Sequence, residues 1–310
     1  MTQKCDAVIL VERLTKDYGR NKGVFDVGFE VKEGEIFGFL GPNGAGKTTT
    51  IRHLMGFIRP DEGSVRIWGK DCFLERADIQ SKLGYLPGEI AFMDGMDGRE
   101  FIRFIAKMKG MDTMERAREL MDYFELDPRG KIRRMSKGMK QKIGIVCAFM
   151  TNPSLLILDE PTSGLDPLMQ NRFTTLLLEE KKRGTTVFIS SHIFEEIEKT
   201  CDRTAFIKDG KIAAIESMDE IRKKRSKVFE IQFAFARQAE AYVSSVRAGG
   251  GKARLLSAGG VYPWAESTVS GDMDPFIKSL GQYQIRDLRV KEQTLEERFL
   301  HLYGGSSNDK

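Results

Sequence analysis

The sequence lacks the features that identify disulfide-rich, zinc-binding or membrane-spanning proteins. It has four cysteines in 310 residues, Cys5, Cys72, Cys147 and Cys201, and none of them forms a CxxC pair. This spacing favours reduced thiols over a disulfide framework or a zinc site. No apolar run approaches the roughly 18 residues needed to cross a bilayer, and runs such as residues 155–158 are only of strand length. We therefore expect no membrane span.

The N-terminal residues and the charge balance argue against further classes. Residues 1–14 place acidic and basic side chains around a short apolar segment, which is not the pattern of a signal peptide. A net charge of +4 is too small over this length to indicate a nucleic-acid partner. We therefore expect a cytoplasmic protein that binds no nucleic acid and meets a membrane only through a partner or a surface.

Strand and helix signals indicate an α/β domain over residues 1–217. The apolar share of 41% and the charged share of 30% are ordinary for a globular protein. The predicted strands are residues 7–11, 24–31, 35–40, 64–68, 155–158 and 185–190. The predicted helices are residues 48–55, 168–181 and 193–201. Because strands and helices alternate, we expect a parallel sheet with crossover helices.

A helical insert is predicted at about residues 96–150, between the two α/β stretches. Helical spacing relates four apolar residues, Phe101, Phe104, Ile105 and Met108, and this pattern favours their packing in a core. A further helix is predicted to begin at Ser136. The insert is therefore expected to form a helical subdomain.

Composition changes near residue 217, and residues 218–303 are predicted to form a small α+β domain. Its predicted strands are residues 228–235, 253–257, 261–270 and 285–290, and its predicted helices are residues 237–246 and 275–280. This β-α-β-β-α-β order is typical of the ferredoxin-like fold. A last helix is predicted at residues 294–302 and a disordered tail at 304–310. The basic cluster 222–225 favours a solvated helix face over contact with acidic lipids.

A glycine-rich segment between a predicted strand and a predicted helix fits the pattern GxxxxGK[ST]. Its members are Gly41, Pro42, Asn43, Gly44, Ala45, Gly46, Lys47, Thr48 and Thr49. The glycines let the backbone curl so that successive N–H groups face an anion, and the helix N-terminus adds a partial positive charge. Lys47 suits the outer phosphates, and the Thr48 hydroxyl suits Mg²⁺. A chance match would lack this strand and helix, so the segment predicts a site for a nucleoside triphosphate.

Two carboxylates, Asp159 and Glu160, follow the buried strand 155–158. In a doubly wound sheet, ligands bind at the carboxyl ends of the strands. Asp159 is expected to hold Mg²⁺, and Glu160 is expected to polarise the attacking water as a general base. An isolated Asp-Glu pair could instead be an acidic start of a helix or turn with no catalytic role. Because the glycine-rich segment is also present, we favour the catalytic role.

With these motifs, residues 5–217 resemble the ABC-type ATPases. Between the two motifs lies the segment 135–141, Met-Ser-Lys-Gly-Met-Lys-Gln, which is similar to the signature LSGGQ of that family at Ser136 and Gly138. The resemblance implies that Ser136 and the helix it begins contact the γ-phosphate bound to a second subunit. From the residues alone, the same segment is an N-capped basic helix.

Three further positions are similar to the family pattern. Tyr18 resembles the aromatic residue that stacks on adenine, although it is also compatible with an ordinary strand end. Asp166 closes the segment 163–166, which resembles the loop that crosses to the partner cassette, although it also fits a plain turn and helix cap. His192 resembles the switch histidine that senses the γ-phosphate, and the chain contains only three histidines.

One segment departs from the family pattern. The family places a glutamine after the strand that here ends in Tyr85, Leu86 and Pro87, but this chain continues with Gly88 and Glu89. The amide that would touch Mg²⁺ is therefore absent, and Glu89 is the candidate metal ligand in its place. Residues 90–97 are expected, by the resemblance, to face the membrane partner.

The resemblance implies an ATP- and Mg²⁺-dependent motor of an exporter, similar to the bacitracin and multidrug resistance type. Two chains would enclose two ATP molecules as a homodimer, on the inner face of the plasma membrane, and drive a separately encoded permease. The first alternative is a soluble ABC ATPase acting on ribosomes or DNA, but the second cassette or long coiled coil of such proteins is not found in this sequence. A P-loop kinase or GTPase is the other alternative, and the sequence shows no NKxD motif to support it.

Overall fold

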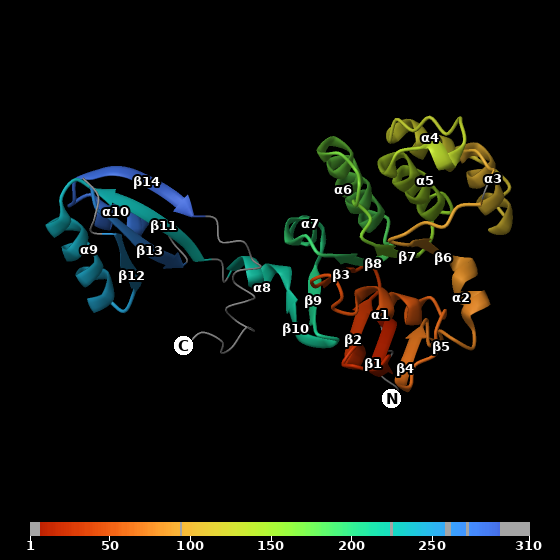
Figure 1. Cartoon of the computed structure of the whole chain (residues 1–310), viewed down its shortest axis with the longest axis horizontal. Coiled ribbons are helices and arrows are strands. Elements are labelled where there is room, and N and C mark those ends of the chain that lie inside the picture. The colour runs from red at the N-terminus through yellow and green to blue at the C-terminus, as the bar shows by residue number, and fades with distance from the viewer. Residues whose placement is uncertain (1–6, 94, 224–225, 258–261, 271–272, 292–310) are drawn as a thin grey trace. The chain divides into compact units, whose positions relative to one another are not determined.

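The computed structural model describes residues 7–93, 95–223, 226–257, 262–270 and 273–291. Two compact units make up the chain, Met1–Met218 and Asp219–Lys310 (Figure 1). The predicted helix 294–302 and the tail 304–310 lie outside the described residues.

A six-stranded sheet forms the centre of the first unit, in the order β10-β9-β3-β8-β7-β6. Its strands are β3 Ile36–Leu40, β6 Leu83–Leu86, β7 Leu155–Asp159, β8 Thr186–Ser191, β9 Arg203–Lys208 and β10 Lys211–Ser217. All pairs are parallel except β9 with the edge strand β10. Every residue of β3, β7 and β8 is buried, as expected for parallel strands covered on both faces. The predicted parallel sheet is thus confirmed.

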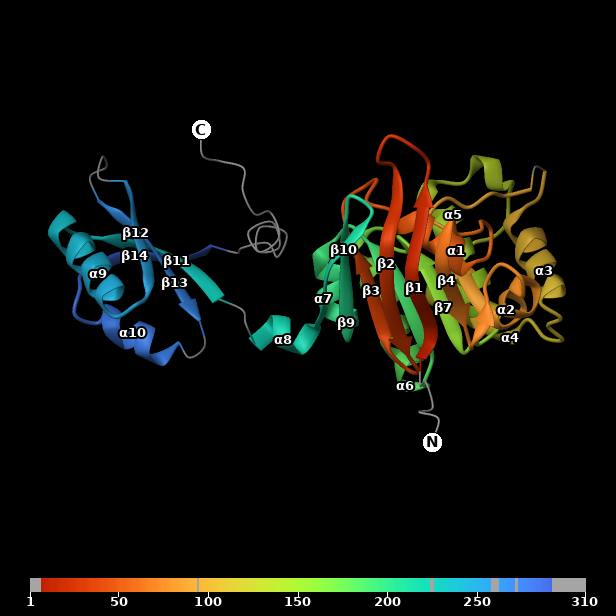
Figure 2. The same ribbon diagram turned by 90° about the horizontal axis from the view of Figure 1, so that it is seen from below.

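A second, antiparallel sheet of the first unit has the order β2-β1-β4-β5. Its strands are β1 Ala7–Asp17, β2 Gly23–Lys32, β4 Glu62–Ile67 and β5 Lys70–Asp71. The helix α1 Lys47–Leu54 contacts β2 and β4 of this sheet and β7 of the parallel sheet (Figure 2). Because α1 packs between the sheets, the segment that precedes it is fixed at the end of β3.

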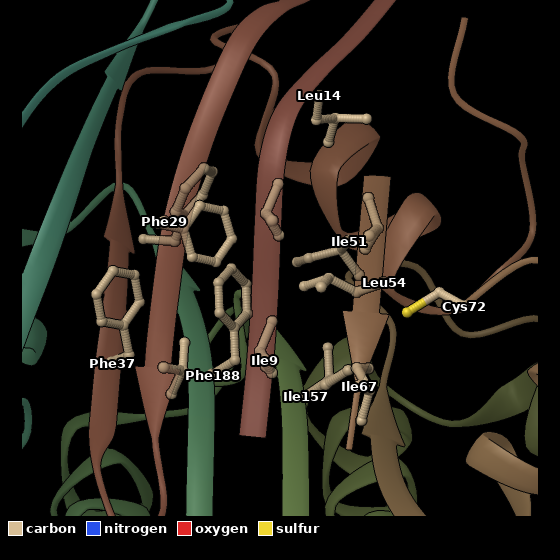
Figure 3. Close-up of a cluster of buried hydrophobic side chains, with 14 of the residues drawn as sticks. Ile9, Leu14, Phe29, Phe37, Ile51, Leu54, Ile67, Cys72, Ile157 and Phe188 are labelled. Carbon is tan, nitrogen blue, oxygen red and sulfur yellow. The ribbon is translucent and has the colours of Figure 1, made fainter. Parts of the chain in front are cut away.

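Aromatic rings fill the core between these elements (Figure 3). The Phe188 ring lies 5.7 Å from that of Phe29, 6.2 Å from that of Phe37 and 5.3 Å from that of Phe39, measured between ring centroids. These residues come from β2, β3 and β8, so the cluster joins the two sheets. Rings at such separations interact favourably beyond the area they bury.

Phe188→Ala is expected to lower the free energy of unfolding by about 3–5 kcal/mol, because it leaves a cavity that the surrounding rings fill only in part. Urea denaturation followed by circular dichroism measures this change. Leu74→Ala is the control, since its side chain is 73% exposed and its loss should have little effect. Equal midpoints for the two variants would contradict the assigned core.

The helical insert comprises α3 Gly98–Met108, α4 Glu115–Tyr123, the short 3₁₀ helix Ile132–Arg134 and α5 Lys137–Phe149. The predicted buried stripe on α3 is confirmed only at Phe101. Phe104 and Ile105 are half-buried and Met108 is 70% exposed, while Ile102 and Ala106 are buried instead. Met108 is the last residue of α3, and the buried face of the helix passes through Phe101, Ile102 and Ala106. The start of α5 was predicted correctly, because Ser136 is its N-cap.

Three more helices complete the first unit, α2 Arg76–Lys82, α6 Pro167–Lys182 and α7 Phe194–Thr200. The helix α7 contacts α6 and the strands β3 and β8. The sequence analysis did not predict α2, α4, β5, β9 or β10. The strands β5 and β10 are short or only partly buried, so their periodic signal is weak, whereas β9 has a buried centre that the sequence analysis overlooked.

A four-stranded antiparallel sheet in the order β12-β13-β11-β14 forms the second unit. The elements are α8 Met218–Lys223 at the boundary, β11 Ser226–Phe233, α9 Ala236–Ala248, β12 Lys252–Ser257, β13 Trp264–Ser270, α10 Asp274–Leu280 and β14 Ile285–Lys291. Tyr242 of α9 and Phe276 of α10 pack with Phe229, Ile231 and Phe233 of β11. The predicted β-α-β-β-α-β order is confirmed, and the strand order is that of the split βαβ fold.

Candidate functional site

The loop of residues 41–46 joins β3 to α1 and curls around the start of the helix. Gly44 and Gly46 have φ angles of 81° and 110°, which favour glycine. A side chain at Gly41 is excluded for another reason, since its Cβ would lie 2.3 Å from the Ile207 carbonyl oxygen. No side chain caps the N-terminus of α1, and its first turn carries no acidic residue. The N–H groups and positive end of the helix dipole therefore suit an anion.

Lys47 lies over this loop with its ammonium group enclosed. Its Nζ donates hydrogen bonds to the carbonyl oxygens of Gly41 at 2.7 Å and Pro42 at 3.2 Å. The same Nζ is 3.4 Å from Oε1 of Glu160, and the Lys47 side chain is only 5% exposed. The cation is thus held where the loop and the carboxylate meet.

Asp159 lies at the end of β7 beneath the start of α1. Its Oδ2 accepts a hydrogen bond of 3.1 Å from the Thr48 hydroxyl, and its Oδ1 accepts one of 2.5 Å from the Ser190 hydroxyl. Burial raises the pKa of the Asp159 carboxyl, and these two donors oppose the shift. A Cβ added to Gly88 would be 3.2 Å from Oδ2, so the chain after β6 packs directly on this carboxylate.

Glu160 and His192 face each other beside Lys47. The Oε1 atom of Glu160 is 3.3 Å from Nδ1 of His192. Glu160 has a φ of 47°, and its N–H donates to the carbonyl oxygen of Ser190 at 3.1 Å and to the Ser190 hydroxyl at 3.2 Å. This left-handed conformation is rare for a residue with a side chain, and it costs about 1–3 kcal/mol. The two side chains are 26% and 44% exposed, so water can reach both.

A cavity of about 460 Å³ adjoins the loop. It is lined by Tyr18, Asn21, Lys22, Gly23, Asn43, Gly44, Gly46, Lys47, Thr48, Thr49, Glu160, Asp209 and Gly210. Tyr18 is 53% exposed, so a face of its ring is free to stack on a planar group. The structure thus places Tyr18 beside the glycine-rich segment. The cavity lining also includes residues of β2 and of the β9–β10 turn, which the sequence analysis did not propose.

The segments that begin α5 and α6 contact each other away from that cavity. Ser136 accepts a hydrogen bond of 3.2 Å from the Met139 N–H. Asp166 accepts one of 3.0 Å from the Met169 N–H. A Cβ added to Gly138 would lie 2.7 Å from the Gly164 carbonyl oxygen, which explains the need for glycine there. Ser136, Gly138 and Asp166 are not among the described residues that line the cavity.

A buried hydrogen bond also joins α5 to the turn that follows β7. Gln141 of α5 donates from Nε2 to the Pro161 carbonyl oxygen at 2.8 Å, and its side chain is buried. Lys137 donates to the Ser163 hydroxyl at 2.8 Å. The start of α5 is therefore tied to the turn that follows Glu160.

Glu89 is exposed and lines a larger cavity of about 970 Å³ together with Thr48, Asp159 and Glu160. Within the described parts of the chain, no hydrogen bond or ion pair joins it to Thr48 or Asp159. No group of three His, Cys, Asp or Glu side chains suited to a metal ion is present among those residues either. The Thr48 hydroxyl and Asp159 carboxylate are nevertheless the hard oxygen donors that Mg²⁺ prefers, and this ion commonly takes only one or two carboxylates besides phosphate and water.

Ser190 is a site residue that the sequence analysis missed. It bonds both Asp159 and the backbone of Glu160, and its side chain is fully buried. The signal for it was its place at the carboxyl end of a predicted parallel strand, where polar residues of neighbouring strands meet.

The sequence matches the family described as ABC transporter over residues 24–163. The bacitracin transport ATP-binding protein BcrA of Bacillus licheniformis is 38% identical over 230 residues, which cover 73% of this chain and 75% of that protein. The linearmycin resistance ATP-binding protein LnrL of Bacillus subtilis is 36% identical over 245 residues, or 77% of this chain and 79% of the relative. The uncharacterized ABC transporter ATP-binding protein YhcH of Bacillus subtilis is 29% identical and covers 97% of this chain and 98% of its own length.

Solved structures show the same cassette. An ATP-binding subunit of an ABC transporter is 32% identical, with a TM-score of 0.65 over 69% of this chain and 92% of that one. The cassette MJ0796, dimeric and bound to ADP and Pi, has a TM-score of 0.62 at 23% identity over 68% of this chain and 98% of its own, and it supports the fold alone. Within the described part of the chain, no helix is both long and apolar enough to cross a membrane.

Proposed function

Because the chain belongs to the ABC transporter family of ATP-hydrolysing subunits, we propose that it is the motor of an exporter and drives a separately encoded permease. One observation carries the chemistry in this proposal. The glycine-rich loop places Lys47 against Glu160, and Glu160 against His192, at one edge of the parallel sheet. Lys47 as a phosphate-binding cation, Glu160 as a base and His192 as a second polar group therefore lie next to one another.

The described residues divide the work of ATP hydrolysis. The loop N–H groups and Lys47 bind the phosphates, and Tyr18 stacks on the adenine. Glu160 accepts a proton from the attacking water, and its partial exposure lets that water reach the carboxylate. His192, 3.3 Å away, orients Glu160 and contacts the γ-phosphate. Tyr18, Lys47 and Glu160 line one cavity, and His192 lies beside Glu160.

Mg²⁺ fits the oxygen donors beside this region. Thr48 and Asp159 would hold it, with Glu89 as a further oxygen donor lining the adjoining cavity. When bound, it neutralises charge that develops on the transferred phosphoryl group. The buried Asp159, whose pKa is raised, gains a cationic partner in that state.

The position of the signature segment supports a homodimer that encloses two ATP molecules. Ser136 and Gly138 line neither of the two cavities described in their own chain, although Lys137 between them lines the larger one. The N-terminus of α5 is therefore available to the γ-phosphate on a second copy, and the loop that ends at Asp166 lies against it. Hydrolysis would remove the phosphate contacts that bridge the two copies and so open the dimer.

The named relatives support a role in drug efflux. One is named for bacitracin transport and another for linearmycin resistance, and both align over about three quarters of this chain. We propose that the substrate class is an antibiotic or another drug, and that the chain binds its permease on the inner face of the plasma membrane.

Co-expression with the multi-span protein of a neighbouring gene tests the proposed partner. The tagged chain is expected in the membrane fraction and to co-purify with that protein in detergent. Expression without it should return the chain to the soluble fraction. A chain that stays soluble in both cases would overturn the proposed transport role, while leaving its ATPase activity in place.

A further inference from the structure

A carboxylate on α7 connects the two segments that carry Glu160 and His192. Glu196 accepts a hydrogen bond from the Thr162 hydroxyl at Oε1, and another of 2.7 Å from the Ser191 hydroxyl at Oε2. Thr162 is two residues after Glu160, and Ser191 directly precedes His192. A single side chain therefore links the turn after β7 to the end of β8.

Both hydroxyl donors are fixed in place. Thr162 and Ser191 are buried, and the Ser191 Oγ also accepts a hydrogen bond of 2.9 Å from the Ile193 N–H. The Thr162 carbonyl oxygen accepts from the Leu165 N–H at 3.0 Å. Glu196 thus accepts hydrogen bonds from two buried hydroxyls, one on each of the segments that carry Glu160 and His192.

Glu160 also contacts Lys47, but neither the Glu160 nor the His192 side chain is enclosed by the protein. Their side chains are partly exposed, so their relative position depends on the backbone beneath them. Glu160 also has a left-handed φ, which persists only when the surrounding structure supports it. Glu196 adds support through Thr162 and Ser191 to that of the hydrogen bonds from the Glu160 N–H to Ser190.

We propose that Glu196 is a positioning residue that keeps Glu160 and His192 in register for ATP hydrolysis. It touches neither reacting atom and acts through Thr162 and Ser191. The proposal rests on the proposed function, since it assigns Glu160 and His192 to that reaction. Binding of ATP by the loop of residues 41–46 does not depend on it.

Glu196→Ala is expected to lower kcat by roughly 10- to 100-fold, because small displacements of reacting groups have effects of this size. The KM for ATP should stay unchanged, since the phosphate-binding loop keeps its contacts. Glu196→Gln should restore part of kcat, because the amide still accepts from one hydroxyl. Steady-state phosphate release by the full-length chain gives both constants.

Glu195→Ala is the matched control. Glu195 is the exposed neighbour on the same helix, so its loss should leave kcat and KM at the wild-type values. A thermal melt of each variant reports the folded fraction, by which kcat is corrected. A lower melting temperature with an unchanged corrected kcat would show a structural role only and would overturn the proposal.

Thr162→Val gives a second, milder test, because it removes one hydroxyl and keeps the volume of the side chain. If Glu196 acts through Thr162, Glu196→Ala combined with Thr162→Val should lower kcat no further than Glu196→Ala alone. Additive losses would overturn the proposed route. A wild-type chain without ATPase activity would instead refute the proposed function, so the two failures are distinguishable.

Discussion

Glu160→Gln is expected to hydrolyse ATP at least about 100-fold more slowly than the wild-type chain while it binds ATP equally well. The amide has nearly the shape of the carboxylate, so the 3.3 Å approach to His192 is retained. It cannot accept a proton from water, and the reaction loses its base. Because ATP then stays intact, the two copies should remain associated around it.

Two measurements check this expectation. Phosphate release gives the rate, and sedimentation velocity with ATP and Mg²⁺ gives the oligomeric state. The variant should sediment as a dimer with ATP and as a monomer with ADP, whereas the wild-type chain should return to a monomer as it consumes ATP. Glu195→Gln serves as the control and should behave as wild type. Normal turnover by Glu160→Gln would refute the assigned base.

Lys47→Met is expected to weaken ATP binding by about 10- to 100-fold. Hydrogen bonds to charged groups contribute about 1.5–3 kcal/mol each, and about 1.4 kcal/mol corresponds to a factor of ten in affinity. Methionine keeps the length of the side chain and fills the enclosed position, but it removes the cation. The bonds of Nζ to Gly41 and Pro42 are lost as well.

Titration with a fluorescent ATP analogue measures the affinity of this variant. Lys211→Ala on the edge strand β10 is the control, since that lysine is exposed and does not line the cavity. An affinity equal to that of the wild-type chain would show that the phosphates do not bind at this loop. A thermal melt without nucleotide separates loss of binding from loss of fold.

The sequence alone predicted the parts of the site whose residues are neighbours in the chain. The segment from Gly41 to Thr49 is a single turn and helix start, so spacing and residue type were enough to recognise it. Asp159 and Glu160 were found in the same way, because they end a buried strand. From the residues alone, Ser136 and Asp166 were expected only as helix caps, and both are N-caps in the structure.

The resemblance to a family added Tyr18 and His192, for which the residues alone gave little reason. The structure places Tyr18 beside the loop and His192 beside Glu160. Neither the residues alone nor the resemblance indicated Ser190, Thr162 or Glu196. A buried serine or a glutamate in a helix has many possible reasons to be present, and the sequence does not say which partner it has.

What the sequence determined is therefore local: which segments are strands or helices, and which turn has the backbone freedom to bind phosphate. Only the tertiary structure brought Thr48 to Asp159, which are 111 residues apart, and Thr162 to Glu196, which are 34 apart. These contacts exist because β7 pairs with β8 and β8 with β3, so that the carboxyl ends of three parallel strands meet at one edge. Strand order depends on packing between distant segments, and no spacing along the chain encodes it directly.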